Sequence, residues 1–344
     1  MEATKMKKWA KKMLITGVLS CSLVGIGGMT MAEALVDVTK NAKAVTFQNG
    51  AWKMAGNLYM PKNYKQGQKY AALIVVHPGG GVKEQTSGLY AMKLAEKGFV
   101  TLAYDASHQG DSEGLPRYLE NPTERVEDIR SAVDYLTTLP YVDIDKIGVV
   151  GICAGGGFAV SAAQTEHRIK AVATASAVDI GTTFRQGWNG QGTVKDQLAT
   201  LEAIAKQRTA EANGAEPQYT QYVPEQNEIT SKTERDMVEA SEYYRTPRGQ
   251  HPNAKNKVLF RSFDKVLAFN AFSQIDTLLT QPVLFIAGTE AGSKWQSEMA
   301  HKKATSKKEL YLIKGATHMD LYDVEKYVNE AVGKMTIFFQ ENLR

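Results

Sequence analysis

Short apolar runs alternate with amphipathic stretches along most of the chain. Short stretches rich in apolar residues predict strands at 44–47, 56–61, 71–76, 100–104, 147–150, 171–175, 282–287 and 309–313. The stretch 71–76 is a continuous apolar run, as expected for a buried strand. Apolar residues spaced by three and four positions predict helices over 87–97, 122–139 and 324–339. Strands that alternate with helices form a sheet with helices on both of its faces. The pattern therefore predicts an α/β fold with a mostly parallel central sheet.

The alternation stops between about 178 and 269, where the chain is polar and charged. Helical patterning continues there over 194–212 and 233–244, without an intervening strand run. We interpret this insertion as a helical cap over the active site, with a surface excursion as the alternative. Its aromatic residues need apolar partners, which favours the cap: Phe184, Trp188, Tyr243 and Tyr244.

The first 34 residues have the features of an export signal. Lysines come first, an apolar run follows over 13–29, and small-x-Ala cleavage sites lie at 30–32 and 32–34. We therefore expect 1–34 to be a signal peptide, 35–344 to be the folded domain, and the protein to be periplasmic or secreted. Two alternatives remain open, namely a retained N-terminal membrane anchor and lipid attachment at Cys21. After cleavage no stable membrane span is expected.

Composition excludes some classes of function. The chain has 41 Lys and Arg against 37 Asp and Glu, and several of the cations lie in the N-terminal segment. No basic stripe with interleaved aromatics is present, so nucleic acid is not expected as a partner. The histidines lack metal-like spacing and no phosphate-binding or dinucleotide motif occurs, so neither metal nor cofactor is expected. The oligomeric state is left open.

The strongest chemical signal is the sequence Gly151-Ile152-Cys153-Ala154-Gly155, between an apolar strand run and a run of small residues. A G-x-nucleophile-x-G turn between strand and helix is a nucleophile elbow, in which the central side chain is exposed above the sheet. Here that residue is Cys153, and a helix N-terminus is expected to lower the pKa of its thiol. The alternative is a buried structural cysteine in a glycine-rich turn.

Two further motifs lie at the positions where enzymes with a nucleophile elbow carry the catalytic base and the oxyanion loop. His318 directly follows the last strand run, which is the place of the catalytic base in this chain order. The sequence His77-Pro78-Gly79-Gly80-Gly81 follows the 71–76 strand run, where esterases carry an oxyanion loop. We expect the backbone N–H groups of Gly80 and Ala154 to form the oxyanion hole.

The sequence leaves the acid partner of His318 open. The usual position is the loop Gly288-Thr289-Glu290-Ala291-Gly292, in which Ala291 stands at the expected Asp. Glu290 is one position away, Glu298 lies farther on, and Asp179 follows an earlier strand run. A Cys–His pair depends less on an acid than a Ser–His pair does, because a thiol ionises more easily.

Together these motifs resemble the dienelactone-hydrolase branch of the α/β-hydrolase superfamily. The resemblance is closest to a subgroup with bacterial proteins of uncertain substrate and fungal polyketide transferases. Its matching stretches are 104–114, 125–129, 151–157, 179–181, 297–298 and 315–323. It implies the α/β-hydrolase fold and acyl chemistry by Cys153 with His318 as base, and its Ser-Glu pair maps onto Ser297-Glu298, which favours Glu298 as the acid.

The expected function is hydrolysis of a small ester, thioester or lactone, with a small acyl compound as the partner. Two alternatives stay open. One is an acyltransferase that uses the same acyl-cysteine intermediate. The other is a non-catalytic binding or redox-sensing module on the hydrolase scaffold.

Overall fold

The computed structural model describes residues 37–344, so the predicted signal peptide and Cys21 lie outside the described residues. The main strands are β1 Ala42–Asn49, β2 Trp52–Tyr59, β3 Tyr70–Val76, β4 Val100–Tyr104, β5 Val142–Ile152, β6 Ile169–Ala175, β9 Val283–Gly288 and β10 Lys308–Ile313. The helices are α1 Thr86–Glu96, α2 Pro122–Thr137, α3 Ala154–Ala163, α4 Ile180–Gln186, α5 Val194–Ala212, α6 Arg235–Arg245, α7 Phe263–Ala268, α8 Lys294–Lys303, α9 Asp320–Asp323 and α10 Glu325–Asn342. No helix of residues 37–344 combines the length and apolarity that crossing a membrane requires.

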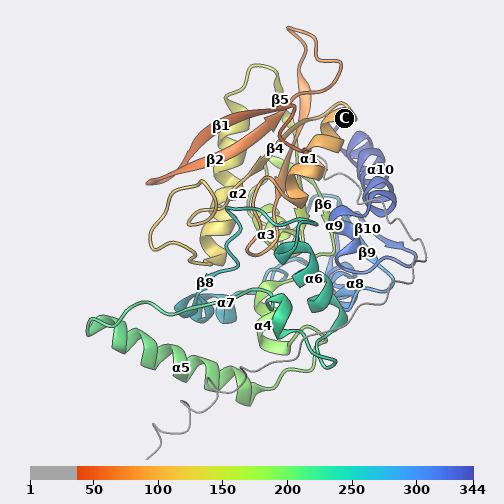
Figure 1. The fold of residues 1–344 in the computed structure, drawn as a ribbon. Helices are drawn as coiled ribbons and strands as arrows, with labels where there is room; N and C mark the ends of the chain where they lie inside the picture. Colours follow the sequence, from red (N-terminus) through yellow and green to blue (C-terminus); the bar gives the residue numbers. More distant parts are fainter. Residues whose placement is uncertain (1–36) are drawn as a thin grey trace, which may run out of the picture. The chain divides into compact units, whose positions relative to one another are not determined.

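The main strands form one sheet in the order β1-β2-β4-β3-β5-β6-β9-β10 (Figure 1). β1 and β2 make an antiparallel hairpin, β2 runs antiparallel to β4, and the remaining neighbours are parallel. The predicted α/β class and mostly parallel sheet are confirmed. Because the parallel strands end at one edge of the sheet, the residues that follow β3, β5, β6, β9 and β10 gather there.

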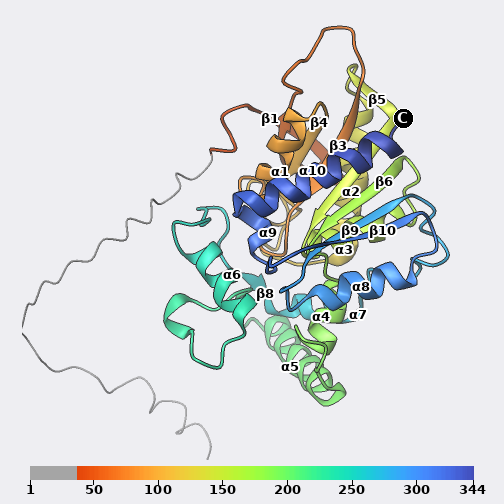
Figure 2. The ribbon, with the colours of Figure 1, turned by 90° about the vertical axis from the view of Figure 1, so that its right-hand side faces the viewer.

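Helices cover both faces of the sheet, as the alternating pattern predicts. Side chains such as Ile74 and Val149 pack with α2 and α3 on one face. Their neighbours Leu73, Val75 and Val150 point to the opposite face and pack with α1 and α10. Figure 2 shows α1 and α10 lying together over that second face. The central strands are therefore buried on both sides, which explains why they read as continuous apolar runs.

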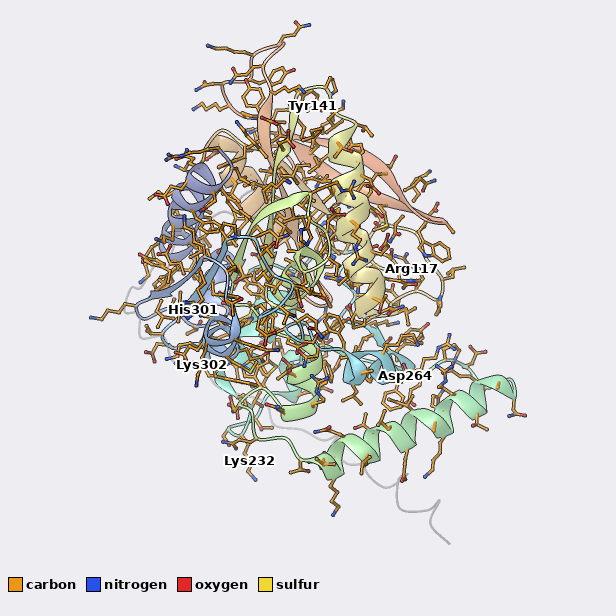
Figure 3. The ribbon with its side chains drawn as sticks, turned by 180° about the vertical axis from the view of Figure 1, so that it is seen from behind. Arg117, Tyr141, Lys232, Asp264, His301 and Lys302 are labelled. Atoms are coloured by element: carbon orange, nitrogen blue, oxygen red, sulfur yellow. The ribbon has the colours of Figure 1, made fainter. Side chains whose placement is uncertain are left out.

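The stretch predicted as a cap, residues 178–269, holds α4, α5, α6 and α7 between β6 and β9; we call it the cap segment. It also holds the short antiparallel pair β7 Tyr219–Thr220 and β8 Val258–Leu259, and the 3-10 turns η2 Gln226–Glu228 and η3 Phe260–Ser262. Figures 1 and 2 show its helices gathered at one end of the sheet. An ion pair of 3.1 Å joins Arg208 of α5 to Asp264 of α7, which Figure 3 labels above α5.

Candidate active site

Cys153 occupies the turn between β5 and α3. Its backbone angles, φ 54° and ψ −124°, are strained for a residue that carries a side chain. Glycines make the turn possible: a side chain at Gly151 would overlap the backbone of Gly155, and one at Gly155 would overlap the carbonyl of Val76. The strand–turn–helix context that the motif requires is therefore present, and the turn places Cys153 on the wall of a pocket.

His318 lies in the loop between β10 and α9 and lines the same pocket as Cys153. Its ring is buried, with Nδ1 2.6 Å from Oγ of Ser293. Its other nitrogen, Nε2, lies 3.4 Å from the Tyr322 hydroxyl. The edge of the Trp188 ring packs against the imidazole, with 4.9 Å between the ring centroids. His318 is thus held on three sides, by Ser293 directly before α8, by Tyr322 of α9 and by Trp188 of the cap segment.

Burial sets the ionisation of both reactive groups. It raises the pKa of the Cys153 thiol, against smaller opposing effects of the Tyr322 hydroxyl and the Ala154 N–H. It lowers the pKa of His318 to about 4, partly offset by the negative charge of Asp236. The lowered thiol pKa expected from the helix N-terminus is therefore wrong, because the loss of hydration outweighs the helix. At neutral pH the site holds a neutral thiol and a neutral imidazole.

The three carboxylates considered from the sequence lie elsewhere. Asp179 caps the N-terminus of α4, where it accepts bonds from the Gly181 N–H at 3.0 Å and the Thr182 hydroxyl at 2.6 Å. Among residues 37–344, the one hydrogen-bond donor to the Glu290 side chain is the neighbouring Thr289 hydroxyl, at 3.3 Å. Glu298 is half exposed and faces Lys294 at 3.8 Å. Within residues 37–344 none of them is hydrogen-bonded to His318, and Ser293 occupies the place of the acid at Nδ1.

Asp236, at the start of α6, is a carboxylate that the sequence reading did not consider. It is buried and lines the pocket together with Cys153 and His318. One of its oxygens, Oδ2, accepts hydrogen bonds from Trp188 Nε1 and from the Gly292 N–H, each at 2.8 Å.

The predicted oxyanion loop runs beside the elbow. Ala154 is the first residue of α3, so its N–H has no acceptor within the helix, and it lines the pocket. Gly79 lines the same pocket, whereas Gly80 faces a small neighbouring cavity against the ring of Tyr222. The loop is anchored by Arg125, which donates to the carbonyl of His77 at 2.8 Å.

The pocket has a volume of about 240 Å³, below the ~300–1,000 Å³ usual for ligand sites. From the domain and its loops come Gly79, Cys153, Ala154, His318, Met319 and Tyr322. From the cap segment come Val178, Ile180, Thr183, Phe184, Trp188, Tyr222, Val223, Asp236, Met237, Ala240 and Tyr244. Tyr243 packs behind Tyr244 and Tyr322 instead. No Lys or Arg stands among these described lining residues, and Asp236 is the carboxylate among them.

No group of three or more His, Cys, Asp and Glu side chains in residues 37–344 is arranged to hold a metal ion. Cys153 is a free thiol.

Three residues around His318 were not identified as site residues from the sequence. Tyr322 had a usable signal, since it lies four positions after His318 within the matched stretch 315–323. Ser293 directly follows the loop in which the acid was sought. Asp236 had no signal, because its place beside Trp188 and Gly292 depends on how the cap segment folds back.

Comparison with known proteins agrees with this fold. The dienelactone hydrolase family matches residues 54–213, which include Cys153 but end before His318. The uncharacterised protein YcjY of Escherichia coli K12 is 45% identical over 86% of this chain and 96% of its own length. The crystal structure of the hypothetical protein PA2218 from Pseudomonas aeruginosa, 36% identical, superposes with a TM-score of 0.82 over 89% of this chain and 95% of that one.

A third similar protein is described as an α/β hydrolase. The α/β hydrolase GrgF from Penicillium sp. sh18 superposes with a TM-score of 0.74 over 88% of this chain and 99% of that one, at 22% identity. The sheet order, the elbow and these matches define an α/β hydrolase. The chain belongs to the dienelactone hydrolase family.

Proposed function

We propose that this hydrolase cleaves a small, uncharged ester, thioester or lactone through an acyl intermediate on Cys153. The observation that carries the proposal is the elbow: a strained cysteine at the start of α3 shares one pocket with a buried histidine. A non-glycine residue with positive φ costs folding energy, about 1–3 kcal/mol, and such strain clusters at functional sites. A cysteine that served only packing would not require it.

Acylation uses the residues in fixed roles. His318 Nε2 takes the proton from the Cys153 thiol as Sγ forms a bond with the carbonyl carbon. The carbonyl oxygen becomes an oxyanion, held by the N–H of Ala154 and that of Gly80 or its neighbour Gly79. When the intermediate collapses, the bond to the leaving group breaks and His318 gives its proton to the departing oxygen or sulfur. The pair starts neutral, so charge separates only during attack.

Deacylation repeats the same steps with water as the nucleophile. His318 takes a proton from water, hydroxide adds to the acyl carbon, and the thiol leaves after receiving the proton back. An alcohol or amine in place of water would make the protein an acyltransferase. Two observations favour keeping this second candidate. The similar protein GrgF is named a polyketide transferase, and the pocket here is small and largely apolar.

The pocket favours short, neutral acyl groups. Its volume is about 240 Å³ and its walls are aromatic and aliphatic. A carboxylate on the acyl group would lose its hydration near Asp236 without gaining a cation, which is unfavourable in a buried site. The raised thiol pKa speaks against a redox sensor, because sensor cysteines have a low thiol pKa.

We also propose that the protein is exported, with residues 1–34 removed as a signal peptide. This rests on the lysine-rich start and the apolar run of that segment. Comparing the N-terminus of the mature protein in a cell fraction with the encoded one tests it, and an intact N-terminus in the cytoplasm would overturn it.

Steady-state kinetics test the reaction. The wild-type protein should turn over short-chain p-nitrophenyl esters and acyl thioesters. Its kcat/KM for substrates with neutral acyl groups should exceed that for substrates with a succinyl group. Cys153→Ala and His318→Gln should each lose at least about a thousandfold in kcat, as the loss of a nucleophile or base does in comparable enzymes. Full turnover by Cys153→Ala would show that the mechanism is wrong.

A further inference from the structure

The partner of His318 at Nδ1 is a neutral hydroxyl, which raises the question of what balances the imidazolium charge. Oγ of Ser293 lies 2.6 Å from Nδ1 and fixes the orientation of the ring. A hydroxyl carries no charge, however, and the site is buried. A buried cation without a nearby anion is costly, so a carboxylate close to the ring would favour the proton transfer.

Asp236 is the carboxylate in the right place. It lines the pocket, is only 4% exposed, and belongs to α6 of the cap segment. Two separate links connect it with His318. It accepts a hydrogen bond from the indole of Trp188, whose ring packs on the imidazole. It also accepts one from the N–H of Gly292, whose neighbour Ser293 contacts Nδ1.

We propose that Asp236 is the positioning carboxylate of His318, so that the cap segment, and not the loop after β9, supplies the acid of the site. The proposal rests on the proposed function of Cys153 and His318. It assigns orientation to Ser293 and charge to Asp236, two tasks that one carboxylate usually combines. It also makes catalysis depend on α6, because withdrawing the cap segment would remove the carboxylate from the imidazole.

Other ionisable groups surround the ring and must be separated from Asp236 in a test. Cys153 and Tyr322 face it from the elbow and from α9, and burial raises the pKa of both. On α6, Arg235 bonds the carbonyl of Glu290 and lies 3.8 Å from Glu239. Burial raises the pKa of Glu239, which lies on the same helix as Asp236, so this carboxylate must be tested separately.

Asp236→Asn removes the charge and leaves both links intact, because the single oxygen Oδ2 accepts both hydrogen bonds. We expect kcat to fall about tenfold, the effect of one pKa unit on the imidazole, with KM unchanged within about twofold. Glu239→Gln and the half-exposed Glu298→Gln are the matched controls, since each removes one negative charge outside the links to His318. Both controls should keep the wild-type kcat.

A titration of His318 by NMR gives a readout that a merely structural role would not move. The imidazole signal is assigned by its absence in His318→Gln. In the wild type it should titrate near a pKa of about 4, and in Asp236→Asn at a distinctly lower pH, because the anion that favours the imidazolium is gone. Asp236→Ser, which also removes the charge and keeps an acceptor, should shift the signal in the same direction if the asparagine variant folds poorly.

An unchanged kcat and an unchanged titration in the folded variant would overturn the role of Asp236, as would an equal loss in Glu239→Gln. A rise in KM or a drop in Tm alone, with the titration unmoved, would also overturn it and reduce Asp236 to a structural contact. Failure of the proposed function is a different result, namely turnover that survives Cys153→Ala.

Discussion

Replacing Ser293 by alanine removes the hydrogen bond to Nδ1 of His318 and little else. The bond spans 2.6 Å between two buried groups. Because Nε2 must accept the thiol proton, Nδ1 carries a hydrogen and donates it to Oγ of Ser293. The same bond strengthens when the ring becomes charged, from about 0.5–1.5 kcal/mol to about 1.5–3 kcal/mol. The difference, about 1–1.5 kcal/mol, is lost from the stabilisation of the transition state in the variant, which corresponds to about a tenfold loss in kcat.

The assay is kcat on a short-chain p-nitrophenyl ester, with Tm measured in parallel. Ser297→Ala is the matched control, since it deletes a buried serine hydroxyl only four residues farther on, in α8, where the hydroxyl donates to the Ala177 carbonyl at 3.4 Å. We expect Ser293→Ala to lose about tenfold in kcat, far less than the ~10⁴-fold reported for a serine triad without its acid. The control should stay close to wild type. Equal kcat values in the two variants would refute the orienting role of Ser293.

Three further predictions concern the same site. Tyr322→Phe should lower kcat by about threefold to tenfold, because the Tyr322 hydroxyl contacts Nε2 of His318 at 3.4 Å and assists ionisation of the Cys153 thiol. An unchanged kcat would show that Tyr322 has no part in the reaction. The value of kcat should change little between about pH 5 and about pH 8, since the pKa of His318 lies at about 4 and that of Cys153 is raised. A bell-shaped pH profile of kcat with its maximum near neutral pH would contradict this. Glu290→Gln should leave kcat at the wild-type value. A loss as large as that of Ser293→Ala would instead indicate that Glu290, in the loop after β9, is the acid partner of His318.

Local signals in the sequence were sufficient to predict the fold and to single out Cys153 and His318, which the structure places in one pocket. Continuous apolar runs marked the buried strands, and the glycines around Cys153 marked the turn. The first half of β5, Val142 to Lys146, was missed because charged residues alternate there at the end of the sheet. Helix α8 was missed because it is polar over most of its length and lacks a clear apolar stripe.

The surroundings of His318 could not be predicted in the same way. Which group meets Nδ1 depends on the path of the loop after β9, and that path brings Ser293 to the ring while Glu290 and Glu298 turn outward. The position of Asp236 depends on the return of α6 over the sheet, which no local pattern encodes. The thiol pKa was predicted in the wrong direction because a helix N-terminus is visible in a sequence, whereas the burial of Cys153 under the cap segment is not.

Intact-mass analysis is the most direct test of the central claim that Cys153 carries the acyl group. Wild-type protein mixed with a short-chain acyl thioester and quenched in acid should gain the mass of one acyl group, and peptide mapping should place it on Cys153. Cys153→Ala should gain none. Deacylation by water alone would indicate a hydrolase, and deacylation only with an added alcohol or amine a transferase. Turnover of the thioester with no adduct on Cys153, or with an adduct on another residue, would contradict the claim.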